Sequence, residues 1–260
     1  MKSGRMLAAA GWATLLFLYM PILVVLVFSF NASQYGARWG GFTWEWYARL
    51  AHNQNILRAA WNSLLIGVVS SVLATVLGTM AALAVERFRW ARPELWEGFF
   101  FIPIVVPELM MAIGFLLLFG VFGFPFGLGT LLLGHTTLNL PIVWLIVRAR
   151  LKKLDPRLEE AALDLGATPW TAFWRVTFPL LSPAIVGGAL TAFAISIDDF
   201  VISFFVAGPN STTLPIQIYS MLKFSISPEV NALSAVLFVA SMVLVGAAHF
   251  LQDRKEGYVH

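Results

Sequence analysis

Residues 61–85 read WNSLLIGVVSSVLATVLGTMAALAV and contain no charged side chain. A hydrocarbon layer about 30 Å thick is crossed by a helix of roughly 20 apolar residues. This stretch therefore predicts a transmembrane helix. Comparable apolar stretches occur at residues 7–30, 98–122, 128–147, 184–206 and 231–251.

The composition also indicates a membrane protein. Hydrophobic residues make up 59% of the 260 positions and charged residues only 12%, whereas soluble domains carry about 25% charged residues. With the apolar stretches, this predicts an all-α integral membrane protein with six spans, in which residues 1–260 form a single transmembrane domain. Cysteine is absent, which excludes disulfides and thiolate chemistry within the chain.

The first apolar stretch follows Lys2 and Arg5, as in a signal peptide. Its run of about 24 residues exceeds the 7 to 15 typical of a signal peptide, so we expect a retained anchor helix.

Lysine and arginine are unevenly distributed around the predicted spans. Because cytoplasmic loops carry an excess of these residues, the richer side is predicted to be cytoplasmic and to hold both termini. The predicted inner residues are Lys2, Arg5, Arg87, Arg89, Arg92, Arg148, Arg150, Lys152, Lys153, Arg157, Arg175, Arg254 and Lys255; the outer ones are Arg38, Arg49, Arg58 and Lys223.

The longest predicted inner loop covers about residues 148–183. Asp155 and Pro156 predict the start of a short helix over 157–165, which Gly166 would end. Leu158, Ala161, Ala162 and Leu165 fall on one side of that helix, and its charged residues Arg157, Glu159, Glu160 and Asp164 are expected to face water.

This loop resembles the EAA loop of bacterial ABC importer permeases. The matching positions are Glu160, Ala161, Ala162, Gly166, Val176, Phe178 and Pro179, with Val176 and Phe178 in place of the usual Ile and Leu. The resemblance implies a type I importer permease fold and a coupling helix, including Leu165, that docks on a separate ATPase. The chain has no phosphate-binding glycine-lysine loop, so ATP and magnesium are expected on that partner and no cofactor on this chain.

Three carboxylates fall within predicted spans: Glu108, Asp198 and Asp199. Each costs on the order of 2.5 to 3.5 kcal/mol at mid-bilayer unless it faces water, a cation or a partner. Since no Lys or Arg lies inside the predicted spans, a polar path for cationic cargo is favoured. Asp198 and Asp199 point about 100° apart on a helix, so one could contact cargo while the other bonds a neighbouring helix. A local structural role remains an alternative, particularly for Glu108.

Two other features of the spans have less specific meanings. Pro103 and Pro107 interrupt the third span and predict either a cavity or a kink. His135 has no second metal ligand at suitable spacing in its helix, so we expect it to be structural and predict no metal site.

Together with the EAA loop, further stretches over nearly all of the chain resemble the second permease of spermidine/putrescine importers. The similar stretches are residues 196–201 (SIDDFV), 203–206, 208–209, 214–215, 218–220 and 227–233 (SPEVNAL), together with Phe42, Thr43, Trp46 and Tyr47. Phe200 beside the two aspartates offers the aromatic wall that favours cations. Trp46 and Tyr47 are expected near the side that receives cargo, although anchoring at the membrane surface is the default role of such aromatics.

The resemblance implies a permease heterodimer, two ATPase subunits and a periplasmic polyamine-binding protein, in the bacterial inner membrane and with no role for nucleic acid. Three alternatives stay open from the residues: a permease for sulfate, molybdate or iron, an ion-coupled secondary transporter, and, least favoured, a membrane enzyme. A secondary transporter should show an internal repeat, and none is evident. No Ser/His/Asp set or zinc motif supports an enzyme.

Overall fold

The computed structural model describes residues 2–34, 38–87, 92–224 and 228–256. Arg89 and Ser227, which entered the sequence predictions, lie outside these residues. Within them the secondary structure is helical apart from one isolated bridge between Asn31 and Phe42. The chain divides into two compact units, Met1–Leu57 with Ile218–His260 and Arg58–Gln217. The prediction of one domain over residues 1–260 stays a prediction.

The first unit contains α1 (Lys2–Phe28), α2 (Glu45–His52) and α12 (Pro228–Glu256). Helix α12 packs against both α1 and α2. Trp46 and Leu50 of α2 are buried, and the Trp46 indole donates a 2.8 Å hydrogen bond to the carbonyl of Asn31. This bond holds α2 to the segment that follows α1.

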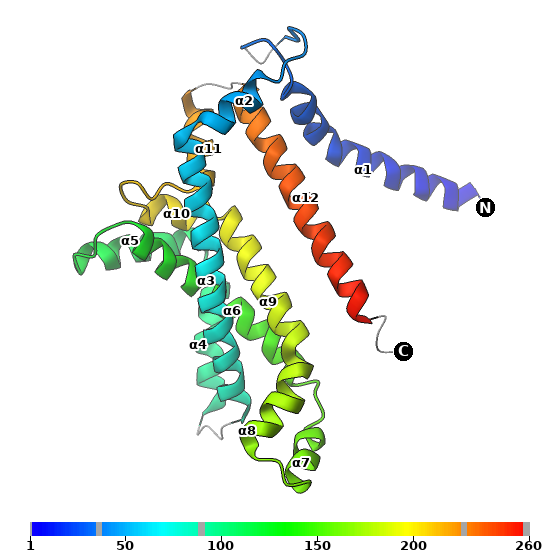
Figure 1. The fold of residues 1–260 in the computed structure, drawn as a ribbon, viewed down its shortest axis with the longest axis vertical. Coiled ribbons are helices and arrows are strands. Elements are labelled where there is room, and N and C mark those ends of the chain that lie inside the picture. Colours follow the sequence, from blue (N-terminus) through cyan, green and yellow to red (C-terminus); the bar gives the residue numbers. More distant parts are fainter. Residues whose placement is uncertain (1, 35–37, 88–91, 225–227, 257–260) are drawn as a thin grey trace. The chain divides into compact units, whose positions relative to one another are not determined.

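The second unit is built around α6 (Leu128–Leu151), which packs along α9 (Phe178–Asp198) (Figure 1). Trp144, Val143 and Val147 of α6 are fully buried. Helix α3 (Gln54–Arg87), which belongs to this unit from Arg58 onward, closely approaches α6 at Gly78. A Cβ atom there would lie 2.9 Å from the carbonyl oxygen of Leu140, so only glycine fits without a shift.

The remaining helices of the second unit are short. They are α4 (Pro93–Val105), α5 (Glu108–Val121), α7 (Arg157–Asp164), α8 (Pro169–Ala172), the π-helix η1 (Phe173–Thr177), α10 (Val201–Val206) and the start of α11 (Leu214–Phe224). Helices α7 and α8 lie at the same end of this unit as the C-terminus of α3 (Figure 1). We call this the inner end, because it carries the predicted cytoplasmic loop.

Four helical stretches among the described residues are long and apolar enough to cross a membrane: Ala10–Phe28, Gln54–Arg87, Leu128–Leu151 and Pro169–Asp198. The pair α4 and α5 makes a fifth if it is counted as one span, and the apolar part of α12, Pro228–Met242, is shorter. Several predicted spans are therefore present, while the count of six stays a prediction.

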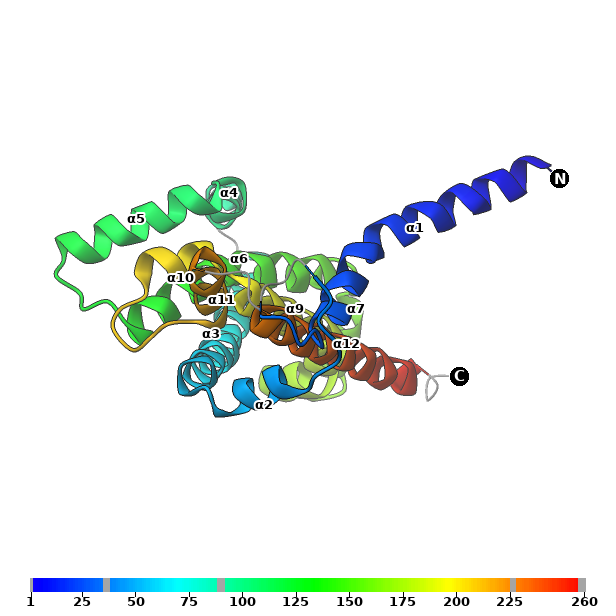
Figure 2. The ribbon, with the colours of Figure 1, turned by 90° about the horizontal axis from the view of Figure 1, so that it is seen from above.

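Two predicted spans are broken rather than continuous. The segment expected over 98–122 bends by 100° between α4 and α5, so that in Figure 2 α4 is seen end-on while α5 is seen along its length. The bend occurs because Pro107 lacks an amide hydrogen and disfavours helical geometry at Val106, which is extended with ψ 129°. The segment expected over 184–206 instead begins at Phe178 and ends at Asp198, and α10 starts separately at Val201.

Candidate coupling and translocation sites

Helix α7 has both of its predicted end signals. The Asp155 carboxylate accepts a 3.0 Å hydrogen bond from the amide of Arg157, which satisfies one of the free amides at the helix start. At the other end Gly166 has φ +87°, and its amide and that of Ala167 bond back to Leu163 and Ala162. This is a Schellman cap, in which glycine adopts a left-handed conformation without strain. The predicted helix is confirmed, with its last helical residue at Asp164 instead of Leu165.

Part of the apolar side of α7 is exposed among the described residues. Leu158 is 49% exposed and Leu165 is 89% exposed, and Ala161 is exposed as well. We call Leu158, Ala161 and Leu165 the docking face. Glu160 is exposed, while Ala162 is half-buried. An exposed leucine face outside the spans is the kind of surface that a protein partner covers.

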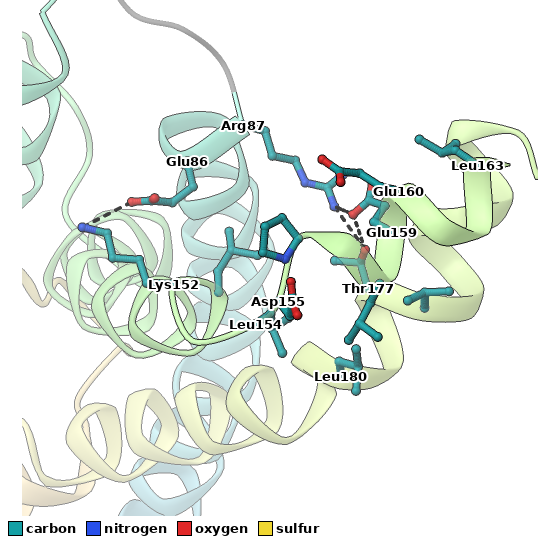
Figure 3. Close-up of a pocket in the computed structure, with 14 residues that line it drawn as sticks. Glu86, Arg87, Lys152, Leu154, Asp155, Glu159, Glu160, Leu163, Thr177 and Leu180 are labelled. Atoms are coloured by element: carbon teal, nitrogen blue, oxygen red, sulfur yellow. Dashed lines mark hydrogen bonds and ion pairs between the residues drawn. The ribbon is translucent and has the colours of Figure 1, made fainter.

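The sequence analysis expected Glu159 to face water, and the structure shows it only partly exposed. Its side chain is 28% exposed, and its carboxylate forms an ion pair with Arg87, the last residue of α3. Thr177 of η1 donates a 2.6 Å hydrogen bond to the same carboxylate oxygen and accepts a 3.2 Å bond from Arg87 (Figure 3). The three residues join α7, α3 and η1.

A second charged cluster ties α3, α4 and α6 together at the inner end. Arg148 of α6 is only 6% exposed; it donates a 2.5 Å bond to Glu86 and also pairs with Glu97 of α4. Its guanidinium lies 4.9 Å from the ring centroid of Trp144. Lys152 lies 3.7 Å from Glu86 as well. A buried arginine is tolerable here because two carboxylates and an aromatic face surround it.

Asp199 lies buried in the gap between α9 and α10. Its carboxylate accepts hydrogen bonds from the amides of Ile202 (3.2 Å) and Ser203 (2.9 Å) and from the Ser203 hydroxyl (2.8 Å). It therefore caps the first turn of α10, where free amides and the helix dipole both favour negative charge. His135 of α6 lies 3.2 Å away through Nε2. Asp199 thus bonds a neighbouring helix, one of the two roles expected for the aspartate pair.

His135 extends this network to two further helices. Its Nδ1 lies 2.6 Å from the hydroxyl of Ser196 in α9, and Nε2 lies 2.9 Å from that of Ser203. Ser196 in turn bonds Ser70 of α3 over 3.1 Å. All of these side chains are buried. We call His135, Asp199, Ser196, Ser203 and Ser70 the mid-span network. No group of three or more potential metal ligands occurs among the described residues.

The other predicted pathway residues have different surroundings. Asp198 is exposed at the last position of α9, and Glu108 is exposed at the first position of α5 with its carboxyl next to that of Asp199. Phe200 is half-buried and forms part of the short break between α9 and α10. The structure thus brings Asp198, Asp199, Glu108 and Phe200 to the two broken spans.

Trp46 and Tyr47 lie elsewhere, in the first unit. The Trp46 side chain is 5% exposed, and the Tyr47 hydroxyl bonds the hydroxyl of Ser29 over 2.7 Å. Tyr47 also packs in an aromatic cluster with Phe30 and Trp44. Both side chains therefore pack within the first unit. The expectation that they lie near incoming cargo stays a prediction.

Sequence reasoning missed Arg87, Glu159 and Thr177 as a connected set. Arg87 was counted only for topology, because partners 72 and 90 positions away leave no local signal. Ser196 and Ser203 had a weak signal, since they stand three and four positions from Asp199.

Comparisons with known proteins identify the family. The model of the family described as "Binding-protein-dependent transport system inner membrane component" matches residues 74–256. This chain belongs to that family. The assignment confirms the prediction of a transport subunit in the inner membrane and excludes the secondary-transporter and enzyme alternatives.

Curated relatives extend the similarity over almost the whole chain. The spermidine/putrescine transport system permease protein PotC of Escherichia coli (strain K12) is 41% identical over 257 residues, covering 98% of this chain and 97% of PotC. The putrescine transport system permease protein PotI of the same strain is 37% identical over 249 residues, covering 92% and 88% of the two chains. The resemblance inferred from the motifs is thereby confirmed.

A solved structure shares the fold of this permease. A chain of a bacterial ABC transporter involved in the import of alginate superposes with a TM-score of 0.70 and 17% identity, covering 97% of this chain and 98% of the other. This likeness supports the predicted permease fold.

Proposed function

We propose that this permease forms one half of the membrane path of an ATP-driven importer for polyamines. The observation that carries the cargo assignment is Asp198, an exposed carboxylate at the C-terminal end of α9. A helix C-terminus carries partial negative charge, so a carboxylate there is opposed by its own helix. A cation offsets both charges, and transporters use broken helix ends in this way.

The neighbouring acids have local compensation, whereas no hydrogen bond or ion pair of the Asp198 carboxylate is found within the described parts of the chain. Asp199 caps α10 and pairs with His135, and Glu108 stands at the N-terminus of α5, where the helix dipole favours an acid. Asp198 is therefore the residue we assign to direct cargo contact, with Glu108 and Phe200 beside it at the broken spans. The buried position of Asp199 favours a supporting role for it.

The identity of the curated relatives supports the same class of cargo. PotC and PotI are permeases of spermidine/putrescine and putrescine transport systems. Polyamines are flexible polycations with apolar spacers, which suit a path that combines carboxylates with aromatic walls.

The proposal includes the partners and the topology. Six spans with both termini in the cytoplasm place the docking face on the cytoplasmic side, where two ATPase subunits that bind ATP and magnesium would contact it. A homologous second permease completes the path, and a periplasmic binding protein delivers cargo. Leu165 supports the ATPase contact because 89% of it is exposed within the described part of the chain, and Leu158 beside it is 49% exposed.

ATP-dependent uptake tests this proposal. The chain is reconstituted with its second permease, ATPase and binding protein in proteoliposomes, and labelled putrescine and spermidine are supplied outside. We expect uptake by the wild type and a loss of about tenfold for Asp198→Asn, the scale of one hydrogen bond to a charged group. Glu94→Gln, which removes an exposed carboxylate from the start of α4, serves as the matched control.

Two results would contradict parts of the proposal. If the wild type moves neither polyamine but takes up labelled sulfate, molybdate or iron, the cargo assignment is wrong and the importer remains. Unchanged uptake by Asp198→Asn would remove this carboxylate from the path.

A further inference from the structure

The coupling helix reaches α3 mainly through one side chain. Between α7 and the inner ends of α3 and α6 lies a cavity of about 530 Å³, lined among others by Glu86, Lys152, Leu158 and Leu163 (Figure 3). Close packing does not fill this space. The Arg87 side chain crosses its edge and pairs with Glu159. Among the described residues of α7, Glu159 alone has a side chain that bonds another helix.

The Arg87 guanidinium is held on three sides. It pairs with the Glu159 carboxylate, donates to the Thr177 hydroxyl over 3.2 Å, and lies 5.5 Å from the ring centroid of Phe173. Phe173 and Thr177 are the first and last residues of the π-helix η1. Such π-turns are rare and are frequent at functional sites. Here the turn directs both residues to one arginine, while Thr177 also donates to Glu159.

Helix α3 is suited to carry movement away from Arg87. It is continuous from Gln54 to Arg87 and contains no proline, whereas the spans formed by α4 with α5 and by α9 with α10 are broken. From Arg58 to Arg87 it extends about 44 Å at 1.5 Å per residue. A helix of this length without a break moves largely as one body.

Three residues of α3 form hydrogen bonds to distant parts of the second unit. Ser70 bonds Ser196 of the mid-span network. The Asn62 amide donates to the carbonyls of Asn210 and Thr212, each over 3.1 Å, and the Ser63 hydroxyl accepts a 2.8 Å bond from the amide of Leu214. These bonds connect α3, which ends at Arg87, to the broken span formed by α9 and α10 and to the loop that contains Asn210 and Thr212.

We propose that Arg87 is a positioning residue that transmits movement of the coupling helix α7 to α3, through Glu159 and Thr177. The proposal rests on the function proposed above, in which an ATPase moves α7. In this proposal Arg87 is assigned no direct contact with cargo or with the ATPase. The role of Arg87 is to make α3 follow α7. Movement of the ATPase at the inner end then changes the position of α3 against the broken span formed by α9 and α10.

The test measures coupling separately from assembly, in the complete reconstituted transporter. For Arg87→Gln we expect the ATPase to co-purify in wild-type amounts and to hydrolyse ATP. The putrescine moved per ATP hydrolysed should fall about five- to tenfold, the range of a typical coupling between sites. Arg92→Gln, an exposed arginine at the start of α4, is the matched control and should keep the wild-type ratio.

Two further variants test whether the effect of Arg87→Gln comes from its link to Glu159. Glu159→Gln removes the same link from the α7 side and should lower the ratio to a similar extent. The double variant Arg87→Glu with Glu159→Arg restores an ion pair with reversed charges and should bring the ratio back to within about twofold of the wild type. Rescue would show that the link between the two side chains, and not either residue alone, sets the ratio. Wild-type ATPase co-purification and ATP hydrolysis in each variant show that the fold is retained.

Each other result has a defined meaning. If Arg87→Gln and Glu159→Gln keep the wild-type ratio, or if the reversed pair fails to rescue it, the proposal is wrong. Loss of ATPase co-purification in Arg87→Gln would assign the residue to docking and would also overturn it. If the wild-type chain itself assembles no ATPase, the proposed function fails before any variant is compared.

Discussion

The inner end and the mid-span network satisfy their polar groups in different ways. At the inner end, Arg87 and Glu159 are full charges with side chains 34% and 28% exposed. In the mid-span network, His135 and Asp199 have side chains 1% exposed, and serine hydroxyls and backbone amides complete their bonds. The first region remains in contact with water and the second does not.

This difference has consequences for rigidity. A partly exposed ion pair contributes little to stability and can exchange partners at low cost. A buried polar group that loses its partner retains the full cost of desolvation. The mid-span network is therefore suited to hold the broken span in one form, and the inner end is suited to move. The predictions below test this contrast.

The largest effect is expected for Asp199→Ala. This change leaves the amides of Ile202 and Ser203 and the ring of His135 without their acceptor, and we expect the free energy of unfolding to fall by about 3 kcal/mol. Asp198→Ala, at the exposed neighbouring position, should change it by less than about 0.5 kcal/mol. Thermal unfolding in detergent compares the two, and equal stabilities would contradict the contrast.

Leu165→Asp should affect assembly and leave the stability of the chain unchanged. Leu165 is 89% exposed, so the chain loses no packing. Covering a leucine contributes about 1.5 to 3 kcal/mol, so the affinity for the ATPase should fall at least tenfold. Binding of the purified ATPase to the detergent-solubilised permease measures this, with Leu165→Met as the control. Wild-type affinity in Leu165→Asp would place the contact elsewhere.

Gly166→Ala is expected to have an intermediate effect. Gly166 has φ +87°, a conformation that costs a residue with a Cβ about 1 kcal/mol. Amide hydrogen exchange of residues 157–164 should accelerate about fivefold. Gly187→Ala is the control, because Gly187 lies within α9 and an added Cβ would meet nothing within 4 Å. Unchanged exchange in Gly166→Ala would show that the cap does not limit the stability of α7.

The smallest effect concerns salt. A double-mutant cycle on Arg87 and Glu159 should give an interaction of about 0.9 kcal/mol in the free energy of unfolding at low ionic strength, which falls toward zero at about 1 M salt. The corresponding cycle on His135 and Ser196 should not change with salt, because both side chains are buried. A salt-independent Arg87–Glu159 interaction would mean that the inner end is as shielded as the mid-span network.

The local elements were largely predictable from the sequence. Asp155 and Gly166 act on amides within a few residues, so the ends of α7 follow from neighbouring positions. Pro107 likewise predicts a break in the span. It does not predict the 100° angle, which depends on how α5 packs against α10. The break after Asp198 was not predicted, because no proline marks it and the Asp199 cap acts together with His135 from another helix.

The sequence by itself determined the membrane environment, the helical class, the short helix α7 and the family, since these depend on apolar length and on short motifs. The tertiary structure decided which aspartate is buried and which is exposed, and it paired Arg87 with Glu159 and Thr177. Those outcomes depend on contacts between residues tens of positions apart, and hydrophobic periodicity carries no information about such pairs.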